Sequence, residues 1–229
     1  MGHFSSQVEA RRKEDNSPVT DADVQSNQLI VKALNSLTPK IPVVGEEDEI
    51  LLAGEHAMFW LVDPLDGTRA FIKGEPEFTV NIGLIKNKKP VLGVIYAPPQ
   101  DAMYWGEMST GAWRKISSHA QEKIHVRTPS PEGLVVVRSK SHPSVGTQEY
   151  LSKFKVKEII AGSSSIKFCQ VAEGSADIYP RLGRTMEWDT AAGHAILNAA
   201  GGRVETVDGK PFMYGKPGFE NPAFVAFGG

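Results

Sequence analysis

The sequence predicts a mixed α and β protein, with an α+β N-terminal half (residues 1–130) and an α/β C-terminal half (residues 131–229). Two patterns carry this prediction. Between residues 58 and 105, segments rich in β-branched and aromatic residues are separated by turn residues, which is typical of an antiparallel sheet. After residue 131, helical apolar patterns alternate with short strands, which indicates a mixed α/β arrangement. With 229 residues, of which 41% are hydrophobic, the chain can bury a sizeable core.

The N-terminal half is expected to begin with an amphipathic helix over residues 23–37, because apolar residues recur there at helical spacing. Pro39 and Pro42 end it. Strands are expected at residues 58–62, 78–85, 91–96 and 103–105, and a short helix at residues 68–73. Residues 115–131 are polar and end in a Thr-Pro-Ser-Pro sequence, so we expect an irregular linker there.

The C-terminal half is expected to alternate strands and helices. The predicted helices cover residues 148–154, 164–173 and 190–200. The predicted strands cover residues 134–137, 156–160, 177–179, 203–205 and 224–227.

Composition narrows the classes of function. The 25 basic and 27 acidic residues give a formal net charge of −2, so nothing in the bulk charge favours a nucleic acid polymer as partner. The single cysteine, Cys169, excludes an intrachain disulfide and is expected in the core. The first 16 residues are polar, unlike a secretory signal, and no apolar run approaches the ~20 residues of a spanning helix. We therefore expect a cytoplasmic protein.

The most informative motif is DPLDGT at residues 63–68, which follows the apolar run at residues 58–62. Pro64 restricts one backbone torsion, and Gly67 permits a torsion that a side chain would forbid. Such a turn can aim Asp63, Asp66 and a backbone carbonyl at one point, and hard cations such as Mg²⁺ prefer oxygen ligands. Asp, Pro and Gly also form ordinary turns, so the motif alone leaves both interpretations open.

Three further acidic sites lie at the edges of apolar elements. They are Asp21 and Asp23, Glu46 to Asp48, and Glu187 with Asp189. Each alone is typical of a helix cap or a solvated surface. Together with DPLDGT they make four acidic sites, each at the edge of an apolar element. An ordinary solvated surface does not require this arrangement, so the pattern predicts a metal site.

The order of these motifs resembles the inositol-monophosphatase superfamily of Mg²⁺-dependent, lithium-sensitive phosphatases. That family's pattern is an Asp before a helix, a Glu-Glu pair, D-P-[IL]-D-G-T and W-D-x-A-A-G. This chain supplies Asp23, Glu46-Glu47, DPLDGT and WDTAAG in that order, over nearly its whole length. Residues 15–23, 63–85, 93–105 and 161–183 resemble the 3'(2'),5'-bisphosphate nucleotidases of the CysQ type more than the simple inositol phosphatases.

The resemblance implies a layered αβαβα sandwich of the sugar-phosphatase type, with an active site between the two halves. It implies that two or three Mg²⁺ ions are bound by the carboxylates and one carbonyl oxygen of Glu46, Asp63, Leu65, Asp66 and Asp189. It further implies that Asp23 and the Thr68 hydroxyl polarise the attacking water. The backbone N–H groups of Gly67 and Thr68 would bind the phosphate at a helix start.

Selectivity for a nucleotide is expected from two other sites. The GSSSIK segment, residues 162–167, is suited to hold a second phosphate through backbone amides, the hydroxyls of Ser163 and Ser164, and the Lys167 ammonium. By resemblance, Arg181 aligns with a residue that binds the nucleotide, and a guanidinium suits phosphate or stacks on a base. On the residues alone, an ordinary helix cap and two solvated cations would explain the same pattern.

The leading hypothesis is therefore a phosphatase that removes the 3'-phosphate of adenosine 3',5'-bisphosphate, a by-product of sulfate assimilation and sulfonation. The 3'-phosphorylated sulfate donor is a second candidate substrate. An inositol or sugar monophosphatase is the alternative among enzymes, and an inactive, truncated nucleotide-binding protein is the alternative outside them. Whether the protein is a monomer or a homodimer stays open, as does a peripheral association with the inner membrane by family resemblance.

Several residues receive lesser roles. Glu47 is expected not to bind metal, while Asp21 and Glu187 are expected to be surface or capping residues. His194 is expected to be structural. Members of the family usually have a long helix before the segment that matches residues 11–23, and here only a short polar stretch precedes it. The roles of three residues stay open: Lys13, Asp15 and His142.

Overall fold

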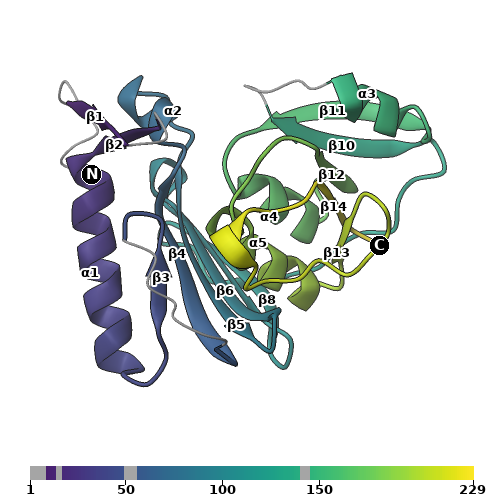
Figure 1. Ribbon diagram of the computed structural model, residues 1–229. Helices are drawn as coiled ribbons and strands as arrows, with labels where there is room; N and C mark the ends of the chain where they lie inside the picture. The colour runs from purple at the N-terminus through teal and green to yellow at the C-terminus, as the bar shows by residue number, and fades with distance from the viewer. Residues whose placement is uncertain (1–8, 14–16, 49–55, 140–144) are drawn as a thin grey trace.

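The computed structural model describes residues 9–13, 17–48, 56–139 and 145–229 of the chain. Two large sheets lie on either side of a central pair of helices, α4 (Ile166–Ala172) and α5 (Glu187–Ala199) (Figure 1). Helix α1 (Asp21–Leu37) covers the outer face of the first sheet, and α3 (Val145–Leu151) packs on the outer face of the second. This layering confirms the predicted αβαβα sandwich.

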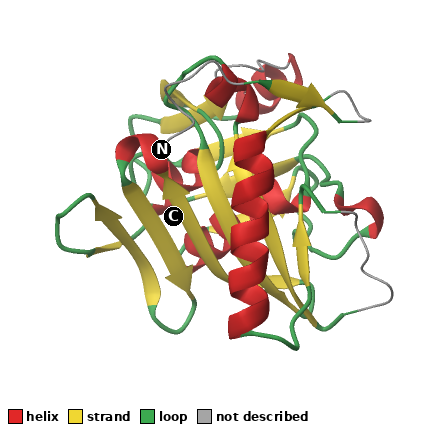
Figure 2. Ribbon diagram, turned by 90° about the vertical axis from the view of Figure 1, so that its left-hand side faces the viewer, coloured by secondary structure: helices red, strands yellow, loops and turns green. Residues whose placement is uncertain are grey.

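The first sheet has the strand order β3-β4-β5-β6-β7-β8-β9. Neighbouring strands are antiparallel, except for β3 and β4, which are parallel. Helix α1 lies lengthwise across the face that Figure 2 presents to the viewer. The strands are β3 (Val43–Gly45), β4 (Met58–Asp66), β5 (Thr79–Lys86), β6 (Lys89–Ala97), β7 (Ala102–Glu107), β8 (Gly111–Ile116) and β9 (Glu122–Ile124).

Three small elements flank this sheet. A two-stranded antiparallel sheet of β1 (Ala10–Arg12) and β2 (Pro18–Thr20) precedes α1. The short helix α2 (Thr68–Ile72) follows β4 directly, as the sequence predicted. A single 3₁₀ turn, η1 (Pro98–Gln100), connects β6 to β7.

The second sheet is mixed, with the order β11-β10-β12-β14-β13. Strand β10 pairs parallel with β11 and β12, and β14 pairs antiparallel with β12 and β13. A second 3₁₀ turn, η2 (Pro217–Phe219), precedes β14. The strands are β10 (Leu134–Ser139), β11 (Val156–Gly162), β12 (Ile178–Arg181), β13 (Arg203–Thr206) and β14 (Phe224–Phe227).

The prediction of an irregular linker at residues 115–131 is wrong in part. Strand β8 extends into this stretch, and β9 lies inside it and pairs with β8 at the edge of the sheet. An edge strand keeps most of its side chains in water, so β9 buries only Ile124 and has a polar sequence. Helix α5 begins three residues before the predicted start, at Glu187, which places Asp189 in its first turn.

The largest hydrophobic core runs through the central helices and joins the two sheets. It includes Leu61 of the first sheet, Phe168 and Ile196 of the central helices, and Phe224 of the second sheet. Cys169 is fully buried in the same core, as expected. The division of the chain near residue 130 stays a prediction, and this core spans both halves.

Helix α5 lies on the first sheet at a distance that only small residues allow. A Cβ atom at Gly83 would lie 2.7 Å from the Cβ of Ala191, and one at Gly93 would overlap the carbonyl oxygen of Ala192. Because cores are close-packed, neither neighbour can move away freely. The helix is thereby held against the sheet by near-backbone contact, and its first turn has a defined position.

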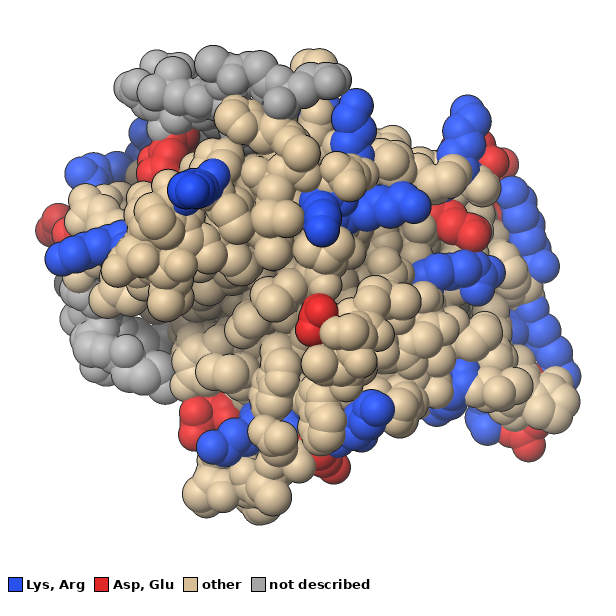
Figure 3. All heavy atoms as spheres, turned by 90° about the horizontal axis from the view of Figure 1, so that it is seen from below, with Lys and Arg blue, Asp and Glu red and all other residues tan. Residues whose placement is uncertain are grey.

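Charged side chains are spread over the surface. Figure 3 shows Lys and Arg side chains around the rim of one face, with fewer Asp and Glu side chains among them. Exposed ion pairs such as Arg11–Asp21 and Arg184–Glu220 contribute little stability because water screens them. Asp21 is thus a surface residue, as expected. Within the described ranges, no helix has the length and apolar character needed to span a membrane.

The close contact of α5 with the sheet can be tested by Gly93→Ala. The added methyl overlaps the Ala192 carbonyl, so we expect the free energy of unfolding to fall by about 1–3 kcal/mol, the usual cost of overpacking. Urea unfolding followed by circular dichroism measures this. Gly146→Ala in α3 is the control, because its new methyl meets only the end of the Leu182 side chain. Equal stability of Gly93→Ala and wild type would contradict the tight packing.

Candidate active site

The DPLDGT motif forms a bulge at the end of β4 rather than a turn beyond the strand. Asp63 pairs with Asn81 and Asp66 pairs with Thr79, so β4 contains one extra residue between these two positions. The Leu65 N–H donates to Asp63 Oδ1 at 3.0 Å. Gly67 follows with φ of 104°, the left-handed torsion that the sequence predicted.

Three of the four carboxylates predicted to bind metal meet at this bulge. Glu46 follows β3, Asp63 lies in the bulge of β4, and Asp189 lies in the first turn of α5. One carboxylate oxygen from each lies within 4.8 Å of the others. Asp66 lies outside this group of three but interacts electrostatically with it. Segments separated by up to about 140 residues thus contribute to one acidic cluster (189 − 46 = 143).

The pKa values of these carboxyls reflect crowding. Burial raises the pKa of Asp63 well above its ordinary value, and repulsion from Glu46, Asp66 and Asp189 adds to this. Burial, followed by repulsion from Asp66, raises the pKa of Asp189 to about 8. Burial also raises the pKa of Asp66, against the opposing charge of Lys167. Asp63 is fully enclosed, whereas Asp66 and Asp189 keep partial solvent access.

An open cavity of about 760 Å³ lies beside the cluster, and residues of both halves line it. Glu46, Asp66 and Asp189 form its acidic side, while Lys167 and Arg181 line it as cations. Volumes of 300–1,000 Å³ are typical of small-molecule sites. A smaller cavity of about 180 Å³, which also contacts Arg181, lies on the neighbouring surface of the second sheet.

Asp23 and Thr68, the predicted catalytic pair, are in contact. The Thr68 hydroxyl lies 3.1 Å from Asp23 Oδ1 and 3.2 Å from the carbonyl oxygen of Leu65. Asp23 Oδ2 accepts hydrogen bonds from the backbone N–H and the hydroxyl of Thr20, at 2.8 and 2.5 Å. Asp23 therefore also forms the capping box of α1, which fixes the direction of its carboxylate.

Lys13 contacts both members of the Glu46-Glu47 pair. Its ammonium donates to Glu46 Oε1 at 3.0 Å and to Glu47 Oε1 at 2.6 Å. Glu47 lies outside the described group of three possible metal ligands, and the expectation that it does not bind metal stays a prediction. Asp15 and His142, whose roles the sequence left open, lie outside the described residues.

The three serines of the GSSSIK segment contact the first sheet and its loops. The Ser163 hydroxyl donates to the Glu77 carboxylate, and the Ser164 hydroxyl to the carbonyl oxygen of Asp66 at 2.9 Å. Ser165 contacts Asn81 at 2.6 Å. The predicted contacts of Ser163 and Ser164 with substrate stay predictions, and both hydroxyls have partners within the protein. The segment joins the two halves directly beside the DPLDGT bulge.

Lys167 and Arg181 are the two cations expected to select substrate. Lys167 Nζ donates to the carbonyl oxygen of Ser164 at 2.5 Å, and burial lowers its pKa to about 8 although Asp66 opposes this. Arg181 donates from Nη2 to the carbonyl oxygen of Arg184 at 3.1 Å. Its Nε is buried and has no hydrogen-bond partner among the described residues. Buried donors are normally paired, so this Nε is an exception among the described residues.

The expectation that Glu187 is a surface or capping residue is wrong. Its side chain is fully buried, and its carboxylate accepts hydrogen bonds from the backbone N–H groups of Gly215 and Lys216. Lys216 Nζ completes an ion pair with it at 2.6 Å. An acidic residue in the first turn of a helix is a common stabilising feature, so nothing local in the sequence distinguished this one. The segment around residue 216 is the partner that sequence reasoning missed.

His194 is buried in the same region, as expected of a structural residue. Its Nδ1 lies 3.1 Å from the Tyr214 hydroxyl. Burial lowers the pKa of His194 to about 3, so its imidazole is neutral at pH 7. It lies on α5 one turn beyond Thr190 and is absent from the lining of both cavities described above.

Comparison with known proteins places the chain in a family. The inositol monophosphatase family model matches residues 1–224. The chain belongs to the inositol monophosphatase family. Among solved structures, the crystal structure of CysQ from Bacteroides thetaiotaomicron, a bacterial member of this family, superposes with a TM-score of 0.85 and 36% identity. The alignment covers 99% of this chain and 90% of that one.

Curated relatives are more similar in sequence. The chain is 46% identical over 220 residues to the 3'(2'),5'-bisphosphate nucleotidase CysQ of Salmonella typhimurium strain LT2, covering 95% of this chain and 88% of that protein. It is also 46% identical over 217 residues to the protein of the same name from Escherichia coli strain K12, covering 93% and 86%. The similarity thus extends over nearly the whole chain.

The crowded carboxyls predict a specific pH dependence of stability in the absence of metal. Because folding raises their pKa values, the folded state retains protons that the unfolded chain has released, and stability falls as these protons leave. The ordinary pKa of 3.8 and the value of about 8 for Asp189 define the window. We expect the melting temperature in excess chelator to fall as pH rises through this window, as scanning calorimetry can measure.

Asp189→Asn removes one of the crowded carboxyls, so the melting temperature of this variant should decline less as pH rises. Saturating Mg²⁺ should have the same effect on the wild-type protein. Glu149→Gln, on the exposed side of α3, is the matched control and should leave the slope unchanged. A melting temperature that rises with pH over the same window would mean that the carboxyls do not repel one another in the folded protein.

Proposed function

We propose that this protein is a Mg²⁺-dependent phosphatase that removes the 3'-phosphate of adenosine 3',5'-bisphosphate. The observation that carries the proposal is the acidic cluster of Glu46, Asp63 and Asp189 beside a cavity that also contains Lys167 and Arg181. Metal ligands and anion-binding cations thus line a single site. Relatives named bisphosphate nucleotidase, at 46% identity over most of their length, support the substrate class.

The donor set fits a hard divalent cation. The three carboxylates offer oxygen ligands from separate elements. A cation between them would counter both causes of the raised pKa values of Asp63 and Asp189, which are burial first and repulsion second. Glu46, Asp63 and Asp189 would hold the metal, with Asp66 and the Leu65 carbonyl beside them. When bound, the two or three ions would neutralise phosphate charge, activate water and stabilise the leaving oxygen.

Thr68 and Asp23 are suited to orient the attacking water. A Thr68 hydroxyl that donates its proton to Asp23 Oδ1 keeps its oxygen lone pairs free to accept a hydrogen bond from water. The two bonds from Thr20 keep the Asp23 carboxylate from turning away. A positioned acceptor of this kind is what general-base assistance requires.

A second phosphate distinguishes this substrate from an inositol phosphate. The metal ions can neutralise only the phosphate that is cleaved, so the other needs a protein cation. Arg181 and Lys167 both line the large cavity. Arg181 and Lys167, among the cations that line this cavity, favour a bisphosphate over an inositol or sugar monophosphate, which remains the alternative substrate class. The 3'-phosphorylated sulfate donor carries the same 3' group and is a second candidate.

The proposal predicts phosphate release that depends on both metal and substrate. Purified protein is incubated with adenosine 3',5'-bisphosphate or inositol 1-phosphate, each with Mg²⁺ or with chelator. We expect release from the bisphosphate only with Mg²⁺, at least tenfold faster than from inositol phosphate. Asp63→Asn is the control for contaminating phosphatases and should show no release.

The other outcomes are informative. Faster release from inositol phosphate would favour a monophosphatase, and full activity in excess chelator would exclude the metal mechanism. Tight binding of the bisphosphate with no release from either substrate would favour an inactive binding protein.

The role of Arg181 gives a second prediction. Removing a charge-assisted contact costs ~1.5–3 kcal/mol, or roughly tenfold to a hundredfold in affinity. Arg181→Ala should therefore raise KM for adenosine 3',5'-bisphosphate by that factor. It should leave KM for adenosine 3'-monophosphate, which lacks only the second phosphate, nearly unchanged. Steady-state kinetics on the two substrates measure the difference.

Arg203→Ala is the matched control, because Arg203 is an exposed arginine on β13 that pairs with Glu205. It should change neither value. If Arg181→Ala impaired both substrates equally, Arg181 would support the fold or the metal site rather than the second phosphate.

A further inference from the structure

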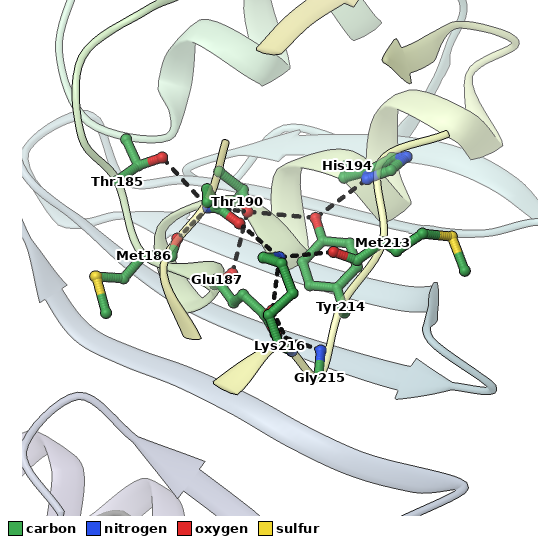
Figure 4. A network of polar contacts seen from close by, with 10 residues as sticks. Thr185, Met186, Glu187, Thr190, His194, Met213, Tyr214, Gly215 and Lys216 are labelled. Atoms are coloured by element: carbon green, nitrogen blue, oxygen red, sulfur yellow. Dashed lines mark hydrogen bonds and ion pairs between the residues drawn. The ribbon is translucent and has the colours of Figure 1, made fainter. Parts of the chain in front are cut away.

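The C-terminal segment between residues 213 and 221 lies across the start of α5 (Figure 4). The Asn221 N–H donates to the carbonyl oxygen of Thr185 at 2.9 Å, and Glu220 forms an isolated antiparallel bridge with Met186. Gly215 and Lys216 in this segment lie 28 and 29 residues along the chain from Glu187, the first residue of α5. The segment nevertheless contacts the two residues that lead into the helix turn bearing Asp189.

The Asn221 side chain reaches the same place. It is only 7% exposed, and its Nδ2 lies 2.6 Å from the carbonyl oxygen of Met186. On its other side, the Met186 N–H donates to Asp189 Oδ2 at 2.8 Å. The Asn221 amide therefore fixes the backbone of Met186 by a hydrogen bond to its carbonyl oxygen. The backbone N–H of Met186 in turn fixes one carboxylate oxygen of Asp189. With Oδ2 held in this way, the carboxylate cannot turn freely, and the position of its other oxygen is fixed as well.

Lys216 determines which way the Asn221 amide points. Its Nζ lies 3.2 Å from Asn221 Oδ1, 2.7 Å from the carbonyl oxygen of Met213 and 2.6 Å from Glu187 Oε1. An ammonium has only donors, so it selects the oxygen of the amide and directs the NH₂ group to Met186. The buried Glu187 carboxylate holds Lys216 by its side chain and its backbone N–H.

We propose that Asn221, oriented by Lys216 and Glu187, is a positioning residue for Asp189 and so sets the affinity of the site for divalent metal. The inference rests on the proposed function, in which Asp189 is a metal ligand. Groups that orient a ligand commonly change metal affinity by 10–100-fold when they are removed. The side chains that link Lys216 to Asn221 and Asn221 to Met186 are buried or half-buried. Water therefore cannot readily replace these contacts.

Tyr214 belongs to the same network of polar contacts but lies away from Met186, and it supplies a matched control. The Tyr214 hydroxyl contacts Thr190 Oγ1 at 3.3 Å and His194 Nδ1 at 3.1 Å. Tyr214 is as deeply buried as Asn221 and belongs to the same C-terminal segment. In Figure 4, dashed lines join the Tyr214 hydroxyl to Thr190 and His194. Tyr214→Phe should therefore lower stability without changing the direction of the Asp189 carboxylate.

The experiment compares Mg²⁺ affinity with stability in the full chain. Isothermal titration calorimetry measures the Kd for Mg²⁺ without substrate, and thermal unfolding in chelator measures stability. Asn221→Leu and Lys216→Met should each raise the Kd for Mg²⁺ at least tenfold, and Lys216→Arg should restore it to near the wild-type value. Tyr214→Phe should lower the melting temperature and keep the Kd within twofold of wild type.

The inference is overturned if Asn221→Leu and Lys216→Met lose stability but bind Mg²⁺ as wild type does. It is also overturned if Tyr214→Phe weakens Mg²⁺ binding as much as they do, because the effect would then follow stability alone. If Asn221→Leu does not fold, the Mg²⁺ affinity of Lys216→Met alone tests the inference. The Lys216 side chain is partly exposed, so its replacement is less disruptive to folding. Wild-type protein that binds no Mg²⁺ would instead refute the proposed metal site, and this inference with it.

Discussion

Mutual repulsion among closely spaced carboxylates is the constraint around which this molecule is arranged. Glu46, Asp63 and Asp189 can approach one another only if their backbones are held firmly. The parallel pairing of β3 with β4 continues to Glu46, whose N–H donates to the Val62 carbonyl at 3.0 Å. Helix α5 brings Asp189 from the other side and rests on Gly93 without an intervening side chain. Packing energy in the sheet and the helix thus offsets the electrostatic cost of the site.

The GSSSIK segment couples the two walls of the cavity. Ser164 adopts a left-handed torsion, φ of 51°, and its hydroxyl bonds to the carbonyl oxygen of Asp66. Such torsions cost on the order of 1–3 kcal/mol in non-glycine residues and persist where the surroundings enforce them. Lys167 follows three residues later, and its positive charge opposes the rise in the pKa of Asp66 that burial causes. In the proposed function, the segment that would hold the second phosphate is therefore mechanically linked to the metal-binding bulge.

The parts of the fold that could be predicted are those with a strong local signal. Strand β14 was predicted with its observed bounds because Phe224–Phe227 is a short apolar run, and Gly67 has the torsion that its place in DPLDGT demanded. Strand β9 was missed because an edge strand with a single buried side chain lacks an apolar alternation. Glu187 was misjudged because its partner, Lys216, is distant in sequence and lies in a segment without regular periodicity.

By itself, the sequence determined the acidic residues and a mixed α and β protein, because these follow from local motifs and patterns. The family and the layered fold followed from the resemblance that those motifs carry. The tertiary structure decided which residues act together. It separated Asp66 from the group formed by Glu46, Asp63 and Asp189, and it joined Asn221 to Asp189 through Met186. Electrostatic repulsion and hydrogen bonding depend on distances between side chains. Those distances exist only once sheets and helices have packed, so no local pattern encodes them.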